Sequence, residues 1–167
     1  MLFNWITKEW SEIEPMKETR EFAMCGQLPD GKIVVTGGIT KYSLTKSTEI
    51  YDPILQQWTS GPELPLYWYQ GKMVEYLDTL LLVNGWAKTY SGEDNFATQT
   101  ILQYTNDAWI EFPKKLPYPR SNAVVFLADG DLFAENCKIT RNSSTQFQRL
   151  SLSIISFSLM MSLYLVE

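Results

Sequence analysis

Histidine is absent from this chain of 167 residues, and only two cysteines are present. Without histidine there is neither the commonest general base nor any metal site built on imidazole. Cys25 and Cys137 lie far apart and form no CxxC pair, which argues against a zinc cluster or a disulfide framework and is typical of a reducing compartment. No basic stretch followed by an apolar run opens the sequence, so we expect no signal peptide. We therefore expect a cytoplasmic protein without catalysis, metal or cofactor.

Positive charge is also scarce, with 14 Lys and Arg against 19 Asp and Glu and a net charge of −5. The nearest approach to a basic run is the pair Lys114-Lys115. Such a chain neutralises phosphates poorly, so we expect no nucleic-acid partner. Aromatic residues, in contrast, reach 14% and apolar residues 45%, which is enough for a core and favours a β-rich fold.

A repeat with a period near 50 residues is the strongest pattern in the sequence. Tryptophan recurs at spacings of 48 and 51, at Trp10, Trp58 and Trp109. Short apolar runs recur at spacings of 47 and 52 and begin at Ile33, Leu80 and Leu132. This period is too long for ankyrin or tetratricopeptide units and suits a four-stranded propeller blade.

Glycines follow the first two apolar runs at the same place. The first run ends in Gly37-Gly38 and the second in Asn84-Gly85. Glycine there predicts a positive φ or a close backbone approach, and asparagine is the next most tolerant residue of the left-handed region. We therefore predict that Asn84 replaces the first glycine of the pair.

These pieces together resemble the kelch repeat: Gly37-Gly38, then Glu49-Ile50-Tyr51-Asp52-Pro53, then Trp58, with Arg20 four residues after Met16. A second, degenerate copy has Trp68 where Arg20 and Arg120 stand. The resemblance implies an all-β fold, a partial kelch-type β-propeller with about two complete four-stranded blades and partial blades at each end. It also assigns blade packing to the recurrent aromatic and glycine residues Trp10, Gly37, Gly38, Tyr51, Trp58, Gly85, Tyr104 and Trp109.

The repeat predicts kelch units over residues 1–135, namely a partial blade 1–19, blades 20–67 and 68–119, and a partial blade 120–135. The expected strands are 20–28, 32–37, 47–52 and 57–60, then 69–77, 79–84, 99–104 and 108–112, with two more in 120–134. Trp10 to Ile13 is expected to be the last strand of a preceding blade whose other strands are absent. Two whole blades cannot close a ring, so we expect the chain alone to be a poorly stable arc.

Residues 136–167 break the repeat and form a hydrophobic tail, in which 150–166 carry no charge. Three interpretations stay open for it. The first is a non-native end, such as read-through past a splice junction. The second is a short membrane anchor, at the lower limit of length for a membrane span. The third is a β-strand, because Leu150, Leu152 and Ile154 alternate with serine.

Partner binding is expected in the long loops after the glycines, where the two copies differ. Loops on one rim of a rigid scaffold commonly carry function, and exposed aromatics with interleaved charges are typical of hot spots. The alternative is that Trp86 and Tyr90 merely cover the blade edge. The candidate residues are Lys41 and Tyr42 in the first loop and Trp86, Lys88, Tyr90, Glu93 and Asp94 in the second.

The resemblance implies a protein–protein interaction module. Many kelch propellers recruit substrates to cullin-type ubiquitin ligases, and others bind actin. The BTB domain and helical linker of such adaptors have no counterpart here, so a cullin scaffold could be reached only through a longer parent. A truncated product without independent function is a further alternative. Catalysis of the galactose oxidase type requires a Tyr/His copper site, which a chain without histidine cannot supply.

Overall fold

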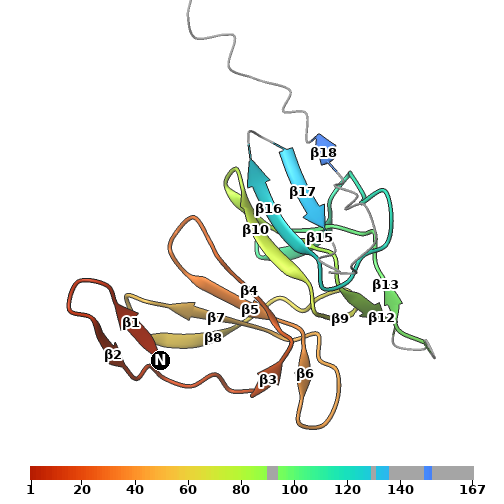
Figure 1. The fold of residues 1–167 in the computed structure, drawn as a ribbon. Coiled ribbons are helices and arrows are strands. Elements are labelled where there is room, and N and C mark those ends of the chain that lie inside the picture. Colours follow the sequence, from red (N-terminus) through yellow and green to blue (C-terminus); the bar gives the residue numbers. More distant parts are fainter. Residues whose placement is uncertain (90–93, 129–130, 136–148, 152–167) are drawn as a thin grey trace, which may run out of the picture.

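The computed structural model describes residues 1–89, 94–128, 131–135 and 149–151, and this part of the chain is built from strands and turns without a helix (Figure 1). No helix in these ranges is therefore long and apolar enough to cross a membrane. Three sheets lie side by side, with β4 against β10 and β10 against β16. They are the blades expected from the sequence period.

The first complete blade is an antiparallel sheet in which each strand pairs with the next strand of the same blade. Across the blade, Ile33 pairs with Tyr51 and Tyr51 pairs with Trp58. The tight turn between its first two strands is closed by Leu28 and Lys32 and has Gly31 at φ +88°. Its strands are β4 (Met24–Gln27), β5 (Ile33–Thr36), β7 (Thr48–Asp52) and β8 (Gln57–Gly61).

The second blade repeats the same order and register. Leu80 pairs with Tyr104, and Tyr104 with Trp109, as Ile33, Tyr51 and Trp58 do in the first blade. Every residue of its second strand is buried, because a blade flanks it on each side. Its strands are β10 (Lys72–Tyr76), β11 (Thr79–Val83), β14 (Leu102–Thr105) and β15 (Ala108–Glu111).

The third sheet holds β16 (Val124–Ala128), β17 (Asp131–Glu135) and β18 (Arg149–Ser151). The first two are the strands expected within 120–134. The third belongs to the segment expected to form a hydrophobic tail, and it pairs with β17 where a third blade strand would lie. Strand structure is thus present at 149–151, and the question of a membrane anchor falls on 152–167, outside the described residues.

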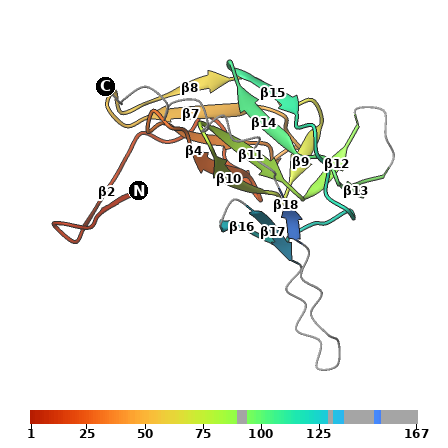
Figure 2. The same ribbon diagram turned by 90° about the horizontal axis from the view of Figure 1, so that it is seen from above.

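The N-terminal residues form a hairpin of β1 (Leu2–Asn4) and β2 (Glu9–Ser11), which projects from the rest of the chain in Figure 2. Trp10 was expected to lie in a last blade strand without its neighbours. That expectation was wrong in one respect, because Phe3 pairs with Trp10 in the register in which Tyr51 pairs with Trp58. Phe3 stands where the two complete blades have tyrosine. Because the residue type differs, this strand of the repeat was not recognised in the sequence.

The long first strand expected in each blade is broken in two by a residue with positive φ. These residues are Phe22 at 55°, Gln70 at 56° and Asn122 at 51°, and their spacings of 48 and 52 follow the repeat. Their backbone groups link successive blades, since Gln70 N–H donates to the carbonyl of Phe22 and Asn122 N–H to that of Gln70. The expectation of continuous strands at 20–28 and 69–77 was therefore wrong.

Two small sheets lie beyond these breaks. One consists of β3 (Arg20–Glu21) and β6 (Ile39–Thr40), and the other of β9 (Tyr67–Tyr69), β12 (Trp86–Lys88) and β13 (Phe96–Ala97). In Figure 1 both lie in the lower part of the view, at the end of the blades where the long loops emerge.

The core fills the two gaps between blades. Met24, Val34, Leu80 and Trp109 belong to the cluster between the first and second blades. A second cluster, between the second and third blades, contains Leu81, Val83, Ile101, Leu116, Leu132 and Ala134. Each blade thus buries its apolar faces only against its neighbours, as repeat architectures do.

Candidate functional site

The two small sheets place the candidate loops at equivalent positions. Glu21 pairs with Ile39 as Tyr69 pairs with Trp86, and two residues further along, Lys88 pairs with Tyr67. The same step places Lys41, which follows Thr40, at the position of Lys88. Both lysines stand three residues after the second glycine of their repeat, a spacing that the sequence alone contains.

The first loop has an ordered tip. The backbone N–H of Thr40 donates to the carbonyl of Ser43 at 2.8 Å, and the N–H groups of Tyr42 and Ser43 donate to Oγ1 of Thr40 at 3.3 and 3.2 Å. Tyr42 at this tip is 87% exposed, and Nζ of Lys41 lies 5.5 Å from its ring centroid. The tip thus presents an exposed aromatic ring and a cation to solvent on an ordered backbone.

Arg20 holds the base of the same loop. Its guanidinium donates to the carbonyl of Gly37 at 3.2 Å and to the carbonyl and Oγ of Ser47 at 2.9 and 2.8 Å. Gly37 precedes the loop and Ser47 ends it, so one fully buried side chain ties both loop ends together. In the sequence Arg20 is recognisable only as a repeat marker, and this role was not predicted.

The charge of Arg20 is balanced by two carboxylates. Its Nη2 lies 3.0 Å from Glu49, whose side chain is 4% exposed, and 3.1 Å from the half-exposed Glu18. Burial alone would raise the pKa of Glu49, but hydrogen bonds from the N–H of Lys17, from Arg20 and from the N–H of Glu18, with the charge of Arg20, lower that pKa below its ordinary value. The loop base therefore contains an ionised pair at neutral pH.

In the second blade an uncharged side chain takes the place of Arg20. Trp68 occupies the position of Arg20, is fully buried, and donates from Nε1 to the carbonyl of Asn84 at 2.7 Å. Asn84 is the counterpart of Gly37, so both side chains reach the same carbonyl of their repeat. Leu102, which lies opposite Leu82, takes the position that Glu49 has in the first blade, and it is apolar.

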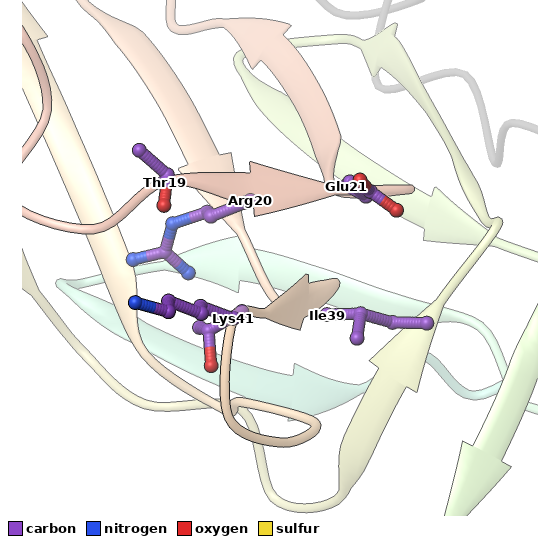
Figure 3. A pocket seen from close by; sticks show the side chains of 6 residues that line it. Thr19, Arg20, Glu21, Ile39 and Lys41 are labelled. Atoms are coloured by element: carbon purple, nitrogen blue, oxygen red, sulfur yellow. The ribbon is translucent and has the colours of Figure 1, made fainter.

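An open pocket of about 510 Å³ adjoins the small sheet of the first blade. Figure 3 shows Arg20 and Lys41 extending toward one side of it, and Glu21 and Ile39 toward the other. The lining is completed by the hydroxyl residues Thr19 and Thr40. The pocket suits a polar or charged group better than an apolar one.

The second loop is described only in part. Trp86 and Lys88 are half-buried on β12, Asp94 is exposed, and Tyr90 and Glu93 lie outside the described residues. Trp86 pairs with Tyr69 on one side and with Ala97 on the other. The structure brings Trp86 and Lys88 together on one short strand.

The recurrent aromatic residues pack in pairs. The ring centroids of Tyr51 and Trp58 are 5.1 Å apart, as are those of Tyr104 and Trp109, and those of Phe3 and Trp10 are 5.0 Å apart. The buried Tyr104 hydroxyl donates to Asp107 at 3.0 Å, and burial with this nearby carboxylate raises the pKa of Tyr104 to about 12. A neutral tyrosine of this kind is part of the packing.

The glycine pairs have the backbone that the sequence predicts. Gly37 and Asn84 have φ of 61° and 54°, and Gly38 and Gly85 have φ of 89° and 109°. Gly38 N–H donates at 2.8 Å to the carbonyl of Trp68 in the next blade. A β-carbon at Gly37 would lie 2.4 Å from that same carbonyl oxygen, which accounts for the need for glycine.

Metal binding has no support in the described ranges, which contain no group of three or more Cys, Asp and Glu side chains placed to hold an ion. The candidate site is thus the surface beyond the small sheets, where the first loop presents charged and aromatic side chains on a base held by Arg20.

Comparison with known proteins gives consistent matches. The Kelch motif family profile matches residues 28–65. Kelch-like protein terF of Aspergillus terreus is 30% identical over 131 residues, covering 72% of this chain and 28% of that protein. Kelch-like protein 40 of Mus musculus is 34% identical over 103 residues, covering 60% of this chain and 16% of that protein. Kelch repeat protein C2 of cowpox virus is 29% identical over 131 residues, covering 77% of this chain and 24% of that protein.

The fold matches as well. The solved structure of YjhT aligns with a TM-score of 0.67 at 12% identity, over 89% of this chain and 56% of that one. This chain spans 16–28% of the length of these curated relatives. With two blades in one register, the glycine pairs at positive φ and the matches to the Kelch motif and to kelch relatives, the chain belongs to the kelch-repeat family.

Proposed function

We propose that this chain is a protein-interaction module that captures its partner with the loops beyond the small sheets. The observation that carries the proposal is the ordered tip of the first loop, where Lys41 and Tyr42 are exposed on a base held by the buried Arg20. A rigid aromatic residue gives contact area at low cost in conformational entropy, which is a property of interface hot spots.

The positive charges of Lys41 and Lys88 favour a partner segment with carboxylates. Lys41 and Lys88 occupy equivalent positions in adjacent blades, so the same feature is offered twice on one face. Trp86 stands two residues before Lys88 and supplies a large apolar surface beside that cation. An acidic segment with apolar side chains complements this arrangement.

Affinity capture with quantitative mass spectrometry tests the proposal. Tyr42→Ala and Lys41→Ala, and separately Trp86→Ala and Lys88→Ala, are compared with the unmodified chain. Ile54→Ala is the matched control, because Ile54 is 86% exposed in the turn between β7 and β8, away from these loops. Loss of the same captured protein in the loop variants supports the proposal, and unchanged capture in all four contradicts it.

The finer assignment is to the substrate-recognition part of a kelch-type ubiquitin-ligase adaptor. Kelch-like protein 40 is among the relatives, and this chain covers 16% of it, so a cullin scaffold would be bound by other parts of a longer parent. Co-purification of a cullin with the longer parent, and ubiquitination of the captured partner that is lost with Tyr42→Ala, are the expected results. Capture of F-actin in a sedimentation assay would instead favour an actin-binding role.

A further inference from the structure

The small sheet of the second blade has one face turned away from the core. In this sheet, β12 lies between β9 and β13 (Figure 1). Ala87 pairs with Trp68, and both are fully buried in the cluster between the first and second blades. Because side chains alternate between the two faces of a strand, the neighbours of these two residues point the other way. These neighbours, which together form the aromatic face, are the half-buried Tyr67, Tyr69, Trp86 and Lys88.

The corresponding face of the first blade is built from residues of other kinds. Glu21 pairs with Ile39 in the register in which Tyr69 pairs with Trp86, so neither ring has an aromatic counterpart there. The residues that correspond to the aromatic face are Thr19, Glu21, Ile39 and Lys41, in which only the lysine is retained. The same backbone arrangement thus forms without rings, and the packing of a small sheet does not account for the three rings of the second blade.

The rings of the aromatic face also differ from the packed aromatic residues in their polar groups. Trp58 and Trp68 each donate from Nε1 to a backbone carbonyl at 2.7 Å. Within the described part of the chain, Nε1 of Trp86 and the hydroxyls of Tyr67 and Tyr69 have no hydrogen-bond partner. None of these three rings stacks on another aromatic ring there either. The aromatic face therefore offers three donors that the described residues leave unused.

Positive charge lies at one end of the aromatic face. Lys88 pairs with Tyr67, and no carboxylate among the described residues forms an ion pair with it. Lys46, near the end of the first long loop, also reaches this end, where its Nζ lies 5.9 Å from the ring centroid of Tyr67. The charge of Lys46 is matched by Glu63 at 3.6 Å. The aromatic face thus has two rings at one end and the uncompensated charge of Lys88 at the other.

We propose that the aromatic face binds an extended, proline-rich segment of another protein that carries a carboxylate at one end. The inference rests on the proposed function, since it names the partner segment of the same surface. A polyproline II segment has no internal hydrogen bonds, so its carbonyls are free to accept from tyrosine hydroxyls and an indole N–H. Its proline rings pack on aromatic side chains, and little conformational entropy is lost because the segment is already extended.

The pairing of the strands argues for contact through side chains. Both sides of β12 are occupied, by β9 and by β13, so a partner cannot add as a strand beside Trp86 and Lys88. A segment lying across the face instead meets the rings with its proline side chains and the donors with its carbonyls. A carboxylate at the end near Lys88 complements the unpaired charge.

Fluorescence polarisation with labelled peptides tests the proposal on the full 167-residue chain. The probes are decaproline alone, decaproline with aspartates at both ends, decaproline with lysines at both ends, and a Gly-Ser peptide of equal length with aspartates at both ends. The aspartate-bearing decaproline should bind about tenfold or more tightly than the lysine-bearing one, and the Gly-Ser peptide should not bind. Trp86→Ala and Tyr69→Ala should each weaken every proline probe about tenfold or more, because each removes a ring of the face.

Three further variants separate rings, donors and charge. Lys88→Ala should abolish the preference for aspartate over lysine and leave the binding of unmodified decaproline unchanged. Tyr69→Phe keeps the ring and its packing but should still weaken the proline probes, because it removes one donor to a carbonyl. Phe96→Ala is the matched control, since Phe96 is 44% exposed on the same sheet but pairs with Ala87, on the opposite face. This control should bind every probe as the unmodified chain does.

Several results would overturn the proposal. These are the absence of binding of every proline probe at millimolar concentration, equally tight binding of the Gly-Ser peptide, and proline binding that is unchanged in Trp86→Ala. Self-association of the chain in sedimentation that is lost in Trp86→Ala would place a second copy on this face and would also overturn it. The proposed function fails by a different result, which is capture of the protein partner that is unchanged in all four loop variants.

Discussion

Arg20 shows how one buried charge can organise a loop. Its guanidinium satisfies Gly37, Ser47 and two carboxylates, and only its Nε lacks a hydrogen-bond partner among the described residues. The second blade reaches the equivalent carbonyl with the indole of Trp68 and places Leu102 where Glu49 stands. The same two backbone positions thus hold a buried ion pair in the first blade and the uncharged residues Trp68 and Leu102 in the second.

Removing only one member of the Arg20–Glu49 pair should strongly destabilise the folded chain. Arg20→Met leaves Glu49 buried without its cation, and we expect a loss of about 3–5 kcal/mol in the free energy of unfolding. The double change Arg20→Trp with Glu49→Leu copies the second blade and should recover most of that loss. Urea unfolding of both variants and of Glu49→Leu measures the coupling, and a double variant as unstable as Arg20→Met would contradict this account.

The same pair predicts how stability depends on pH. The pKa of Glu49 is lower in the folded chain than its ordinary 4.5, so the stabilisation is present above pH 4.5 and is lost as pH falls through the folded value. The urea midpoint should therefore fall as the pH is lowered from about 6 to about 3. Glu49→Gln should flatten this fall, whereas Glu75→Gln, at an exposed residue of β10, should leave the slope unchanged.

At the scale of the element, the break within each first strand decides where the loops emerge. Phe22, Gln70 and Asn122 adopt the left-handed conformation at the same place in three repeats. Asparagine tolerates this region well, whereas a phenylalanine there is strained. Phe22 is also 53% exposed, so its ring contributes little burial to offset that strain.

Phe22→Asn should therefore stabilise the chain, by up to about 1 kcal/mol in the free energy of unfolding. Tyr42→Asn is the control, since Tyr42 is also an exposed aromatic residue but is not among the residues with positive φ. Thermal unfolding of the two variants separates backbone strain from loss of an exposed ring. A Phe22→Asn variant less stable than the unmodified chain would show that the ring, and not the backbone, matters.

The strands of the two whole blades could be predicted from the sequence because tryptophan, tyrosine and glycine mark the same positions in each copy. The breaks could not, since no residue type is shared by positions 22, 70 and 122. The hairpin strand β1 was missed because Phe3 replaces the tyrosine. At the site, the equivalence of Lys41 and Lys88 could have been found from their spacing to the glycines, but the bonds of Arg20 depend on packing that only the fold shows.

At the scale of the whole molecule, burial is uneven from blade to blade. The second blade has a neighbour on both sides, and all five residues of β11 are buried. Among the described residues, the first blade has only the projecting hairpin on one side, and the third sheet exposes Val124 and Phe126. Since each blade depends on its neighbours for burial, stability should be greatest in the middle and least at the ends.

Hydrogen exchange read by mass spectrometry tests this gradient. The amides of β11 and β14 should exchange last, because both strands pair on either side and lie between the two core clusters. The amides of β1 and β2 should exchange first, because a two-stranded hairpin is marginal on its own. Equal protection of all strands would mean that the blades unfold as one unit, against the nearest-neighbour account of their stability.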